Sequence, residues 1–382
     1  MRDCTTGNLC LVDTAPGLER LVRFLESVTA AGVDLEADSM FHFHEKVCLI
    51  QICANDACFL VDPLRIDDLS PLKPFFADPS IKKVFHGADY DIRSLHRDFG
   101  ITVANLYDCE LACRFLGEKA TGLDTAVAKR FGVTLDKRYQ KKDWSVRPLP
   151  APMLEYAAED VRYLVRLSAM LEKELEEKGR DSWVKEECDA LSTVRCAPKT
   201  GAPMFMNFKG AGRLGRRSLA ALEELLQARN DLARSMDRPP FKIFSDDRLL
   251  RIAAERPKSK KKLQKMGVFS AKQIARYGDA VLDAVKRAES IDKENLPVYP
   301  RPKRKSPSHA VSLRISTLGK WRSRKADDLG LDPGVFFPKH LVVAVAMERP
   351  GTLEALGSIE GMRQWRTREF GSEILELLER VG

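Results

Sequence analysis

The 382-residue sequence predicts an α/β domain with a mixed sheet flanked by helices, followed by two small all-helical modules. Short apolar β-type runs at residues 33–35, 47–50 and 59–61 alternate with later helical segments, which is typical of an α/β domain. The chain after residue 196 is expected to be helical and contains an internal repeat. A chain of this length has room for two or three domains.

Two stretches mark the domain boundaries, because their composition cannot form a core. Residues 197–203 combine Pro, Gly and Lys, and residues 295–309 are basic and rich in proline. The predicted organisation is an α/β domain at 1–196, a first helical module at 211–290, a basic linker at 291–309 and a second helical module at 310–382.

The two helical modules are related by an internal repeat. Glu255-Arg256-Pro257 recurs as Glu348-Arg349-Pro350, so residue 257 corresponds to residue 350. The same offset, without a gap, pairs further positions: Leu225 with Leu318, Arg229 with Arg322, Ala233 with Ala326, Pro240 with Pro333, Phe244 with Phe337, Ala253 with Ala346, Leu263 with Leu356, Gly278 with Gly371 and Leu282 with Leu375. These agreements predict two copies of one fold, of which the second is more divergent.

Two acidic residues lie close together in the first predicted strand. Asp34 and Glu36 are two positions apart in the apolar run 31–37, and an extended strand places such residues on one face. Carboxylates this close repel each other unless a cation lies between them, and Mg²⁺ prefers carboxylate oxygens. The alternative interpretation is an edge strand that carries two solvated acids.

Two predicted helices each carry an acid beside their buried stripe. In residues 85–95 an apolar strand end runs into a helix, and Asp91 lies on the flank of its apolar stripe. In residues 152–165 apolar side chains recur at helical spacing, and Tyr156 and Asp160 share one face. A structural salt bridge of Asp91 and a surface tyrosine beside an acid are the alternatives.

Together the four acids and Tyr156 resemble, in order, spacing and flanking sequence, the Asp-Glu-Asp-Asp exonucleases of the ribonuclease D type. Residues 86–92 resemble the second motif of that family. Tyr156-x-x-x-Asp160 resembles the third motif in its tyrosine version, since the histidine version would need His where this chain has Glu155. The resemblance covers about residues 10 to 180, and the first helical module resembles the helicase-and-ribonuclease-D C-terminal (HRDC) domain.

This resemblance implies a ribonuclease H-like α/β fold followed by two HRDC-type helical bundles. It also implies a 3′–5′ exoribonuclease that releases nucleoside 5′-monophosphates with two metal ions about 3.5–4 Å apart. Asp34, Glu36 and Asp160 would hold the ion that activates water, and Asp34 and Asp91 the ion at the leaving group. Tyr156, with an ordinary pKa near 10, would orient the water. Oxygen ligands suit Mg²⁺ or Mn²⁺.

Further residues are expected to contact the nucleic acid, namely Leu35, His42, His86, Lys137, Arg138, Lys141, Lys142 and Trp144. The basic and aromatic residues at 137–144 lie in a loop that precedes the last motif. This loop is expected to bind the nucleic-acid strand near the site. For His42 the alternative is a satisfied surface histidine, and for His86 a buttress of the helix that carries Asp91.

Charge is divided between the two parts of the chain. Residues 1–196 contain 26 Lys and Arg against 33 Asp and Glu, net −7, whereas the remainder contains 37 against 22, net +15. The densest basic runs are Lys258, Lys260, Lys261 and Lys262, and Arg301, Lys303, Arg304 and Lys305. A basic tail is expected to seek phosphates and to deliver RNA to an acidic catalytic domain, although charge runs are also common on solvated surfaces.

The nine cysteines contain no Cys-x-x-Cys pair, so no zinc site is predicted. Their odd number and the lack of a secretory apolar segment after Met1 predict reduced thiols in the cytoplasm. No run approaches the roughly 18–20 apolar residues of a membrane span. The expected partner is RNA, either tRNA precursors or other structured RNA with a single-stranded 3′ end, and a monomer without an obligate protein partner is expected.

Two alternative functions remain open at the level of sequence. The same catalytic fold edits and repairs DNA, so the chain could be a 3′–5′ DNA exonuclease. An exonuclease domain that has lost activity would instead give a nucleic-acid-binding protein. The complete set of acids favours an active enzyme.

Overall fold

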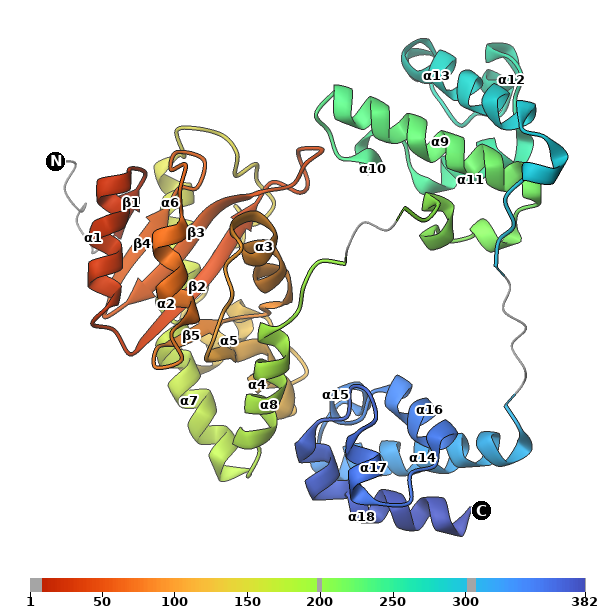
Figure 1. The fold of residues 1–382 in the computed structure, drawn as a ribbon. Helices are drawn as coiled ribbons and strands as arrows, with labels where there is room; N and C mark the ends of the chain where they lie inside the picture. Colours follow the sequence, from red (N-terminus) through yellow and green to blue (C-terminus); the bar gives the residue numbers. More distant parts are fainter. Residues whose placement is uncertain (1–8, 198–200, 301–306, 382) are drawn as a thin grey trace. The chain divides into compact units, whose positions relative to one another are not determined.

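The computed structural model describes residues 9–197, 201–300 and 307–381. The chain forms two compact units (Figure 1), of which one comprises Met1–Ala37, Val47–Cys196 and Ser306–Gly382, and the other Asp38–Lys46 and Ala197–Lys305. The predicted basic run Arg301, Lys303, Arg304 and Lys305 and residues 198–200 of the first linker lie outside the described residues.

The α/β part is built on a mixed sheet, as predicted. Within the described residues the six strands are β1 (Leu9–Val12), β2 (Ala30–Ala37), β3 (Val47–Ala54), β4 (Ala57–Val61), β5 (Lys82–Phe85) and β6 (Leu106–Asp108). Their order is β1-β4-β3-β2-β5-β6. The β2–β3 and β3–β4 pairs are antiparallel, and the other pairs are parallel. Strand β2 is therefore central, with a neighbour on each side.

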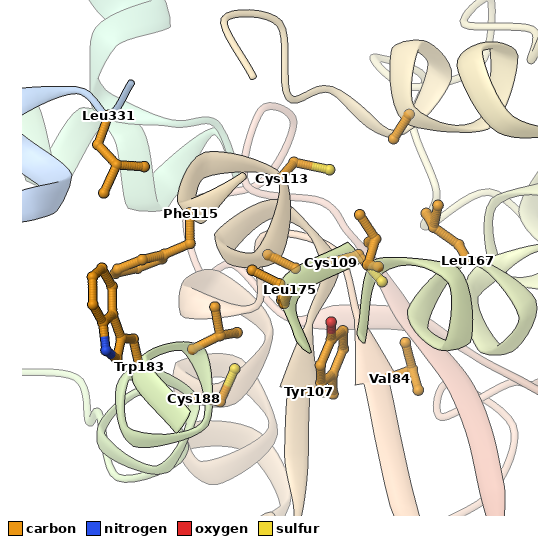
Figure 2. Packing of buried hydrophobic residues seen from close by; sticks show 14 of the residues in the cluster. Val84, Tyr107, Cys109, Cys113, Phe115, Leu167, Leu175, Trp183, Cys188 and Leu331 are labelled. Carbon is orange, nitrogen blue, oxygen red and sulfur yellow. The ribbon is translucent and has the colours of Figure 1, made fainter. Parts of the chain in front are cut away.

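Helices cover the sheet. They are α1 (Ala15–Leu25), α2 (Lys73–Ala77), α3 (Asp89–Phe99), α4 (Cys109–Phe115), α5 (Leu123–Phe131), α6 (Ala151–Arg162), α7 (Leu164–Glu177) and α8 (Asp181–Ser192), with a 3-10 turn at Ser70–Leu72. Alternate strand residues belong to different buried clusters: Leu49 and Val84 to one, Ile50 and Phe85 to the other. Figure 2 shows the first of these clusters. This alternation is that of a sheet buried on both faces. No helix in the described residues is long and apolar enough to cross a bilayer.

Each helical module repeats the same order of elements. The first contains α9 (Arg216–Ser235), α10 (Pro240–Ile243), α11 (Asp246–Glu255), α12 (Lys260–Lys265) and α13 (Ala271–Ser290), and the second α14 (His309–Leu329), α15 (Pro333–Phe336), α16 (Lys339–Glu348), α17 (Leu353–Gly357) and α18 (Gln364–Arg380). Three 3-10 turns, Met204–Asn207, Ala211–Arg213 and Lys293–Asn295, flank the first module.

A hydrogen bond from an arginine to a backbone carbonyl recurs at equivalent positions of the repeat. Nη1 of Arg229 on α9 donates to the carbonyl of Phe244 at 3.2 Å, and Nε of Arg322 on α14 donates to the carbonyl of Phe337. In both modules the arginine thus ties the first long helix to the turn after the next short helix. The repeat read from the sequence therefore corresponds to equivalent tertiary contacts.

Backbone conformation also recurs at equivalent positions. Arg256 and Arg349 end α11 and α16 with φ of 44° and 48°. Asp237 and Gly330 both have positive φ, 44° and 64°, just after α9 and α14. Glycine adopts this left-handed conformation without the steric cost that other residues incur, so Gly330 in place of Asp237 preserves the fold.

The second module packs on the α/β domain within the same compact unit. The rings of Trp183 on α8 and Trp365 on α18 are stacked with centroids 4.4 Å apart. Beside them Nη1 of Arg366 lies 2.7 Å from Oε1 of Glu187. This buried arginine thus has a carboxylate partner where the two elements meet, as a buried charge requires.

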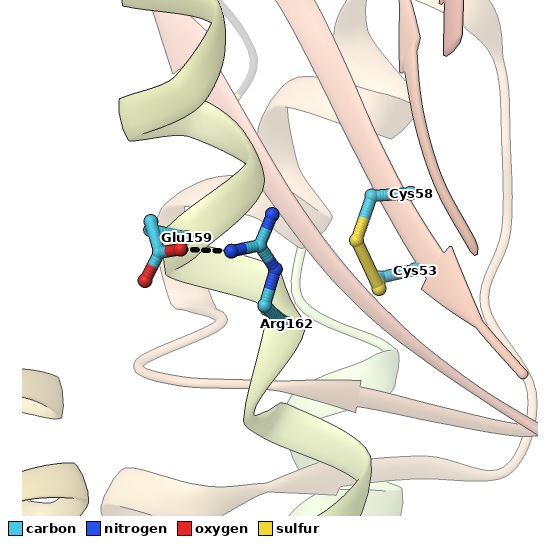
Figure 3. The surroundings of a disulfide bond; sticks show 4 residues. All are labelled: Cys53, Cys58, Glu159 and Arg162. Atoms are coloured by element: carbon cyan, nitrogen blue, oxygen red, sulfur yellow. Dashed lines mark hydrogen bonds and ion pairs between the residues drawn. A yellow bond between two sulfur atoms is a disulfide. The ribbon is translucent and has the colours of Figure 1, made fainter. Parts of the chain in front are cut away.

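One expectation about the cysteines is wrong. Cys53 and Cys58 form a disulfide (Figure 3) that bridges β3 and β4. The connecting residues Asn55 and Asp56 both have positive φ, which is typical of a tight two-residue hairpin, and the two cysteines lie directly opposite each other. The prediction of reduced thiols counted cysteines along the sequence and did not take this strand register into account.

Candidate active site

The first two acids lie on the central strand of the sheet. Asp34 and Glu36 are half-buried on β2, opposite Gln51 and Leu49 of β3. The intervening Leu35 is buried. The predicted common face of the two acids is therefore present, and the alternative of a solvated edge strand is wrong because β2 has a neighbour on each side.

Asp91 enters the site from the first turn of α3 and is only 6% exposed. The start of this helix is fixed by Asp108, whose carboxylate accepts hydrogen bonds from the backbone amides of Gly87 at 2.9 Å and Ala88 at 2.8 Å. The alternative interpretation of Asp91 was a salt bridge. Among the described residues Asp91 has no ion-pair partner, and the charges that act on it are acidic.

Tyr156 and Asp160 lie one turn apart on α6, as their spacing predicts. The hydroxyl of Tyr156 and the carboxyl of Asp160 lie close enough for each to change the pKa of the other. Tyr156 is 8% exposed, and burial together with the neighbouring Asp160 and Glu36 raises the pKa of its hydroxyl. The hydroxyl therefore stays protonated and can donate.

Neighbouring acids of this set raise the pKa of one another. Burial, followed by the charge of Asp160, raises the pKa of Asp34 to about 7. Burial and then Asp34, Asp160 and Asp91 raise the pKa of Glu36 to about 10. The pKa of Asp91 is raised by burial and then by Asp34, and that of Asp160 is raised to about 6, mainly by burial. A cluster of this kind is unfavourable when fully ionised unless cations compensate its charge.

Three of the acids and Tyr156 line one cavity of about 370 Å³. Its walls include residues from the strand, the helix and the loop: Asp34, Leu35, Glu36, His86, Glu110, Gly122, Leu123, Asp124, Leu135, Asp136, Lys137, Gln140, Tyr156, Asp160 and Leu164. The size is within the range of pockets that bury a small organic ligand. The cavity can therefore admit the end of a nucleotide chain.

The donor set fits hard divalent cations. Every candidate ligand is a carboxylate oxygen, which suits Mg²⁺ and Mn²⁺ and disfavours softer metals. In the described residues no group of three or more His, Cys, Asp or Glu side chains is arranged closely enough to form a metal site as it stands. A bound cation would offset the mutual repulsion of these carboxylates.

The predicted nucleic-acid contacts fall into two groups. Leu35, His86 and Lys137 line the cavity, and Nζ of Lys137 lies 2.8 Å from Oδ2 of Asp124 on the same wall. Burial, as the main cause, lowers the pKa of His86, so its ring is neutral at pH 7. The remaining basic side chains, Arg138, Lys141 and Lys142, are exposed on the loop outside the cavity lining.

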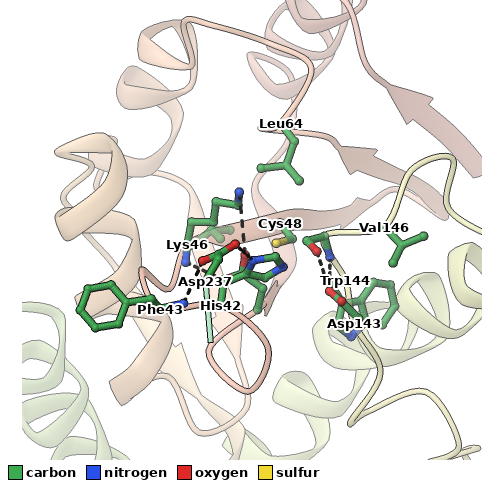
Figure 4. Close-up of polar contacts among 12 residues, drawn as sticks. His42, Phe43, Lys46, Cys48, Leu64, Asp143, Trp144, Val146 and Asp237 are labelled. Carbon is green, nitrogen blue, oxygen red and sulfur yellow. Dashed lines mark hydrogen bonds and ion pairs between the residues drawn. The ribbon is translucent and has the colours of Figure 1, made fainter. Parts of the chain in front are cut away.

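One predicted contact, Trp144, is wrong, and another, His42, has a partner within the protein. Trp144 is 1% exposed, so its ring belongs to the core and cannot stack on a base. His42 belongs to the other compact unit, where its Nδ1 lies 2.6 Å from Oδ2 of Asp237 in the first helical module (Figure 4). The prediction for Trp144 was wrong because the sequence does not show that its ring is buried, and the sequence also does not show the distant partner of His42.

Sequence reasoning missed Asp108. Its carboxylate also accepts from the amides of Glu110 at 2.8 Å and Leu111 at 3.2 Å, so one buried side chain caps α4 and holds the start of α3. Asp immediately before a helix is a recognised N-cap signal that could have identified the first of these roles. Its second role depends on the pairing of β5 with β6.

The chain matches two family models. A model described as 3′–5′ exonuclease matches residues 10–176, and the HRDC domain model matches residues 218–285 and 314–378, one match in each copy of the repeat.

Full-length relatives agree with these matches. The chain is 30% identical to ribonuclease D of Desulfotalea psychrophila over 328 residues, which cover 85% of this chain and 87% of the relative. It is also 30% identical to ribonuclease D of Escherichia coli over 291 residues, 76% of this chain and 77% of the relative. The solved structure of Escherichia coli RNase D superposes with a TM-score of 0.73 at 25% identity and covers 97% of this chain and 98% of that one. The catalytic core of RRP6 from Trypanosoma brucei gives 0.64 at 30% identity, over 75% and 81% of the two chains.

Fold and family matches together define the class of this protein as a 3′–5′ exonuclease of the Asp-Glu-Asp-Asp type that carries two HRDC domains. Within that class the chain belongs to the ribonuclease D family. It is accordingly a 3′–5′ exoribonuclease, and the predicted family, fold class and reaction are confirmed.

Proposed function

We propose that Asp34, Glu36, Asp91 and Asp160 hold two divalent ions, Mg²⁺ or Mn²⁺, against the 3′-terminal phosphodiester of RNA. The observation that carries this proposal is that Asp34, Glu36 and Asp160 line a single cavity, while the charge of Asp34 acts on the buried Asp91. When bound, such ions supply an activated water, relief of charge at phosphorus and stabilisation of the leaving 3′-oxygen.

The protein's own residues supply binding and orientation. Tyr156 and Asp160 lie beside each other in the cavity lining, so the phenol reaches the site where Asp160 would hold a cation. Because the pKa of this phenol is raised, Tyr156 orients the attacking water and is not its general base. Lys137 on the cavity wall offers a positive charge to a phosphate of the entering strand.

The substrate we propose is structured RNA with a single-stranded 3′ end, including tRNA precursors. Arg138, Lys141 and Lys142 are exposed near the last motif, and the helical part carries the net positive charge of the chain. We assign the anchoring of RNA to this basic part and the hydrolysis to the acidic part. The proposed domain boundaries are those predicted from the sequence, and the proposed state is a cytoplasmic monomer.

A labelled-oligonucleotide assay tests the proposal. Matched RNA and DNA strands with a 5′ label are incubated with the protein in Mg²⁺, Mn²⁺ or EDTA, and Asp34→Asn serves as the inactive control. Stepwise shortening of RNA from its 3′ end only in the presence of metal supports the proposal. Preferential degradation of DNA would favour a DNA exonuclease, and tight binding without shortening would favour an inactive binding protein.

A further inference from the structure

The loop that precedes α6 is fixed to the sheet by one arginine. Nε of Arg147 donates to Oδ2 of Asp62 at 2.6 Å, and its Nη2 donates to Oδ1 of Asp62 and to the carbonyl of Cys48, both at 2.7 Å. Asp62 is 2% exposed and lies at the end of β4. A bidentate pair of this kind has a defined geometry, so it sets the position of the arginine relative to two strands.

The remaining arm of the same guanidinium holds the loop itself. Nη1 of Arg147 donates to the carbonyl of Trp144 at 2.7 Å and to that of Val146 at 2.8 Å. The indole Nε1 of Trp144 is buried and has no hydrogen-bond partner among the described residues. The orientation of this ring is therefore set by its backbone and by packing, and Arg147 fixes the backbone (Figure 4 labels Trp144 and Val146).

The ring of Trp144 packs against the proposed water-orienting residue. Its centroid lies 6.0 Å from that of Tyr156, with an interplanar angle of 36°, and the ring of Tyr139 lies 6.0 Å from Tyr156 at 58°. The hydroxyl end of Tyr156 lies beside Asp160. The two aromatic contacts on the ring therefore restrict where the phenol points.

We propose that Trp144 and Arg147 are positioning residues for hydrolysis, and that they act through Tyr156. This inference rests on the proposed role of Tyr156. The ion pair of Asp62 and Arg147 fixes the loop, the loop fixes the indole of Trp144, and the indole restricts the phenol of Tyr156 to an orientation beside Asp160. A displacement of about 1 Å at a reacting group can lower a rate by about 10²-fold, so this support matters to kcat.

A role in stability alone is the competing explanation, and a double-mutant cycle separates the two. Trp144→Leu removes the aromatic contact, and Arg147→Lys keeps the charge beside Asp62 but cannot make the same set of bonds. Each is measured in the wild-type background and with Tyr156→Phe. We expect kcat to fall about 10-fold or more in the wild type and less than about twofold in the Tyr156→Phe background, with KM little changed. Trp144→Phe, which keeps an aromatic ring, should retain most of kcat.

The outcomes distinguish failure of this inference from failure of the proposed function. If Tyr156→Phe itself does not lower kcat, the proposed role of Tyr156 is wrong. If Tyr156→Phe lowers kcat but Trp144→Leu and Arg147→Lys lower it equally in both backgrounds, the inference is wrong. Trp183→Leu is the matched control, because it removes another buried indole, one that stacks on Trp365 outside the cavity lining. It should lower the melting temperature and change kcat equally little in both backgrounds.

Discussion

Replacement of Asp34 by Asn should stabilise the metal-free protein while it abolishes turnover. In the folded chain the pKa of the Asp34 carboxyl rises from 3.8 to about 7, because the group is buried beside Asp160. At about 1.4 kcal/mol for each tenfold change in proton affinity, this corresponds to about 4 kcal/mol of destabilisation when the carboxyl is ionised. Asparagine carries no charge, so it removes this cost and also removes a ligand for the cations.

The sign of the pH dependence follows from the raised pKa. The folded protein binds the proton of Asp34 more tightly than the unfolded chain does, so the contribution of this group to stability is most favourable below about pH 4. It is lost as the pH rises from about 4 to about 7, and above pH 7 the full cost is present. Asp34→Asn should therefore gain most over the wild type at pH 8 and little at pH 4.5.

Differential scanning calorimetry in EDTA measures this effect. At about 2–4 °C per kcal/mol for a unit of this size, the variant should melt about 10 °C higher than the wild type at pH 8. Asp89→Asn is the matched control, since Asp89 lies exposed on α3 and pairs with Arg93. It should give no such increase. A metal-free Asp34→Asn protein that melts at or below the wild-type temperature at pH 8 would refute the cost of ionising Asp34 on which this prediction depends.

Three further predictions concern catalysis, RNA binding and helix ends. Tyr156→Phe should lower kcat by about 10²-fold and leave the affinity for Mn²⁺ nearly unchanged in calorimetric titration; loss of activity as complete as in Asp34→Asn would contradict a positioning role. Replacement of Lys258, Lys260, Lys261 and Lys262 by Gln should weaken RNA binding and reduce the slope of the logarithm of the binding constant against the logarithm of the salt concentration. An unchanged slope would show that these lysines do not contact phosphates. Gly330→Ala should destabilise the second module by about 1–2 kcal/mol, because Gly330 has a φ of 64°. Gly319→Ala should stabilise the module by about 0.5–1 kcal/mol, because Gly319 lies inside α14 with open space around the added methyl. If thermal unfolding showed equal effects of the two substitutions, backbone conformation would not explain the role of Gly330.

The sequence by itself determined the features that depend on local periodicity. The common face of Asp34 and Glu36 follows from the two-residue period of a strand, and the proximity of Tyr156 and Asp160 follows from the helical turn. The equivalence of the two helical modules follows from a constant offset along the chain, and the structure repeats it in the bonds of Arg229 and Arg322.

Only the tertiary structure decided which distant residues meet. Asp91 acts on Asp34 because β5, which leads into α3, lies beside β2 in the sheet, and no local period encodes that order. The same holds for Arg147 and Asp62, which are 85 positions apart and form a bidentate pair. Local spacing fixes the direction of a side chain on its own element, whereas its burial and its partners depend on how the elements pack, and packing is a property of the whole chain.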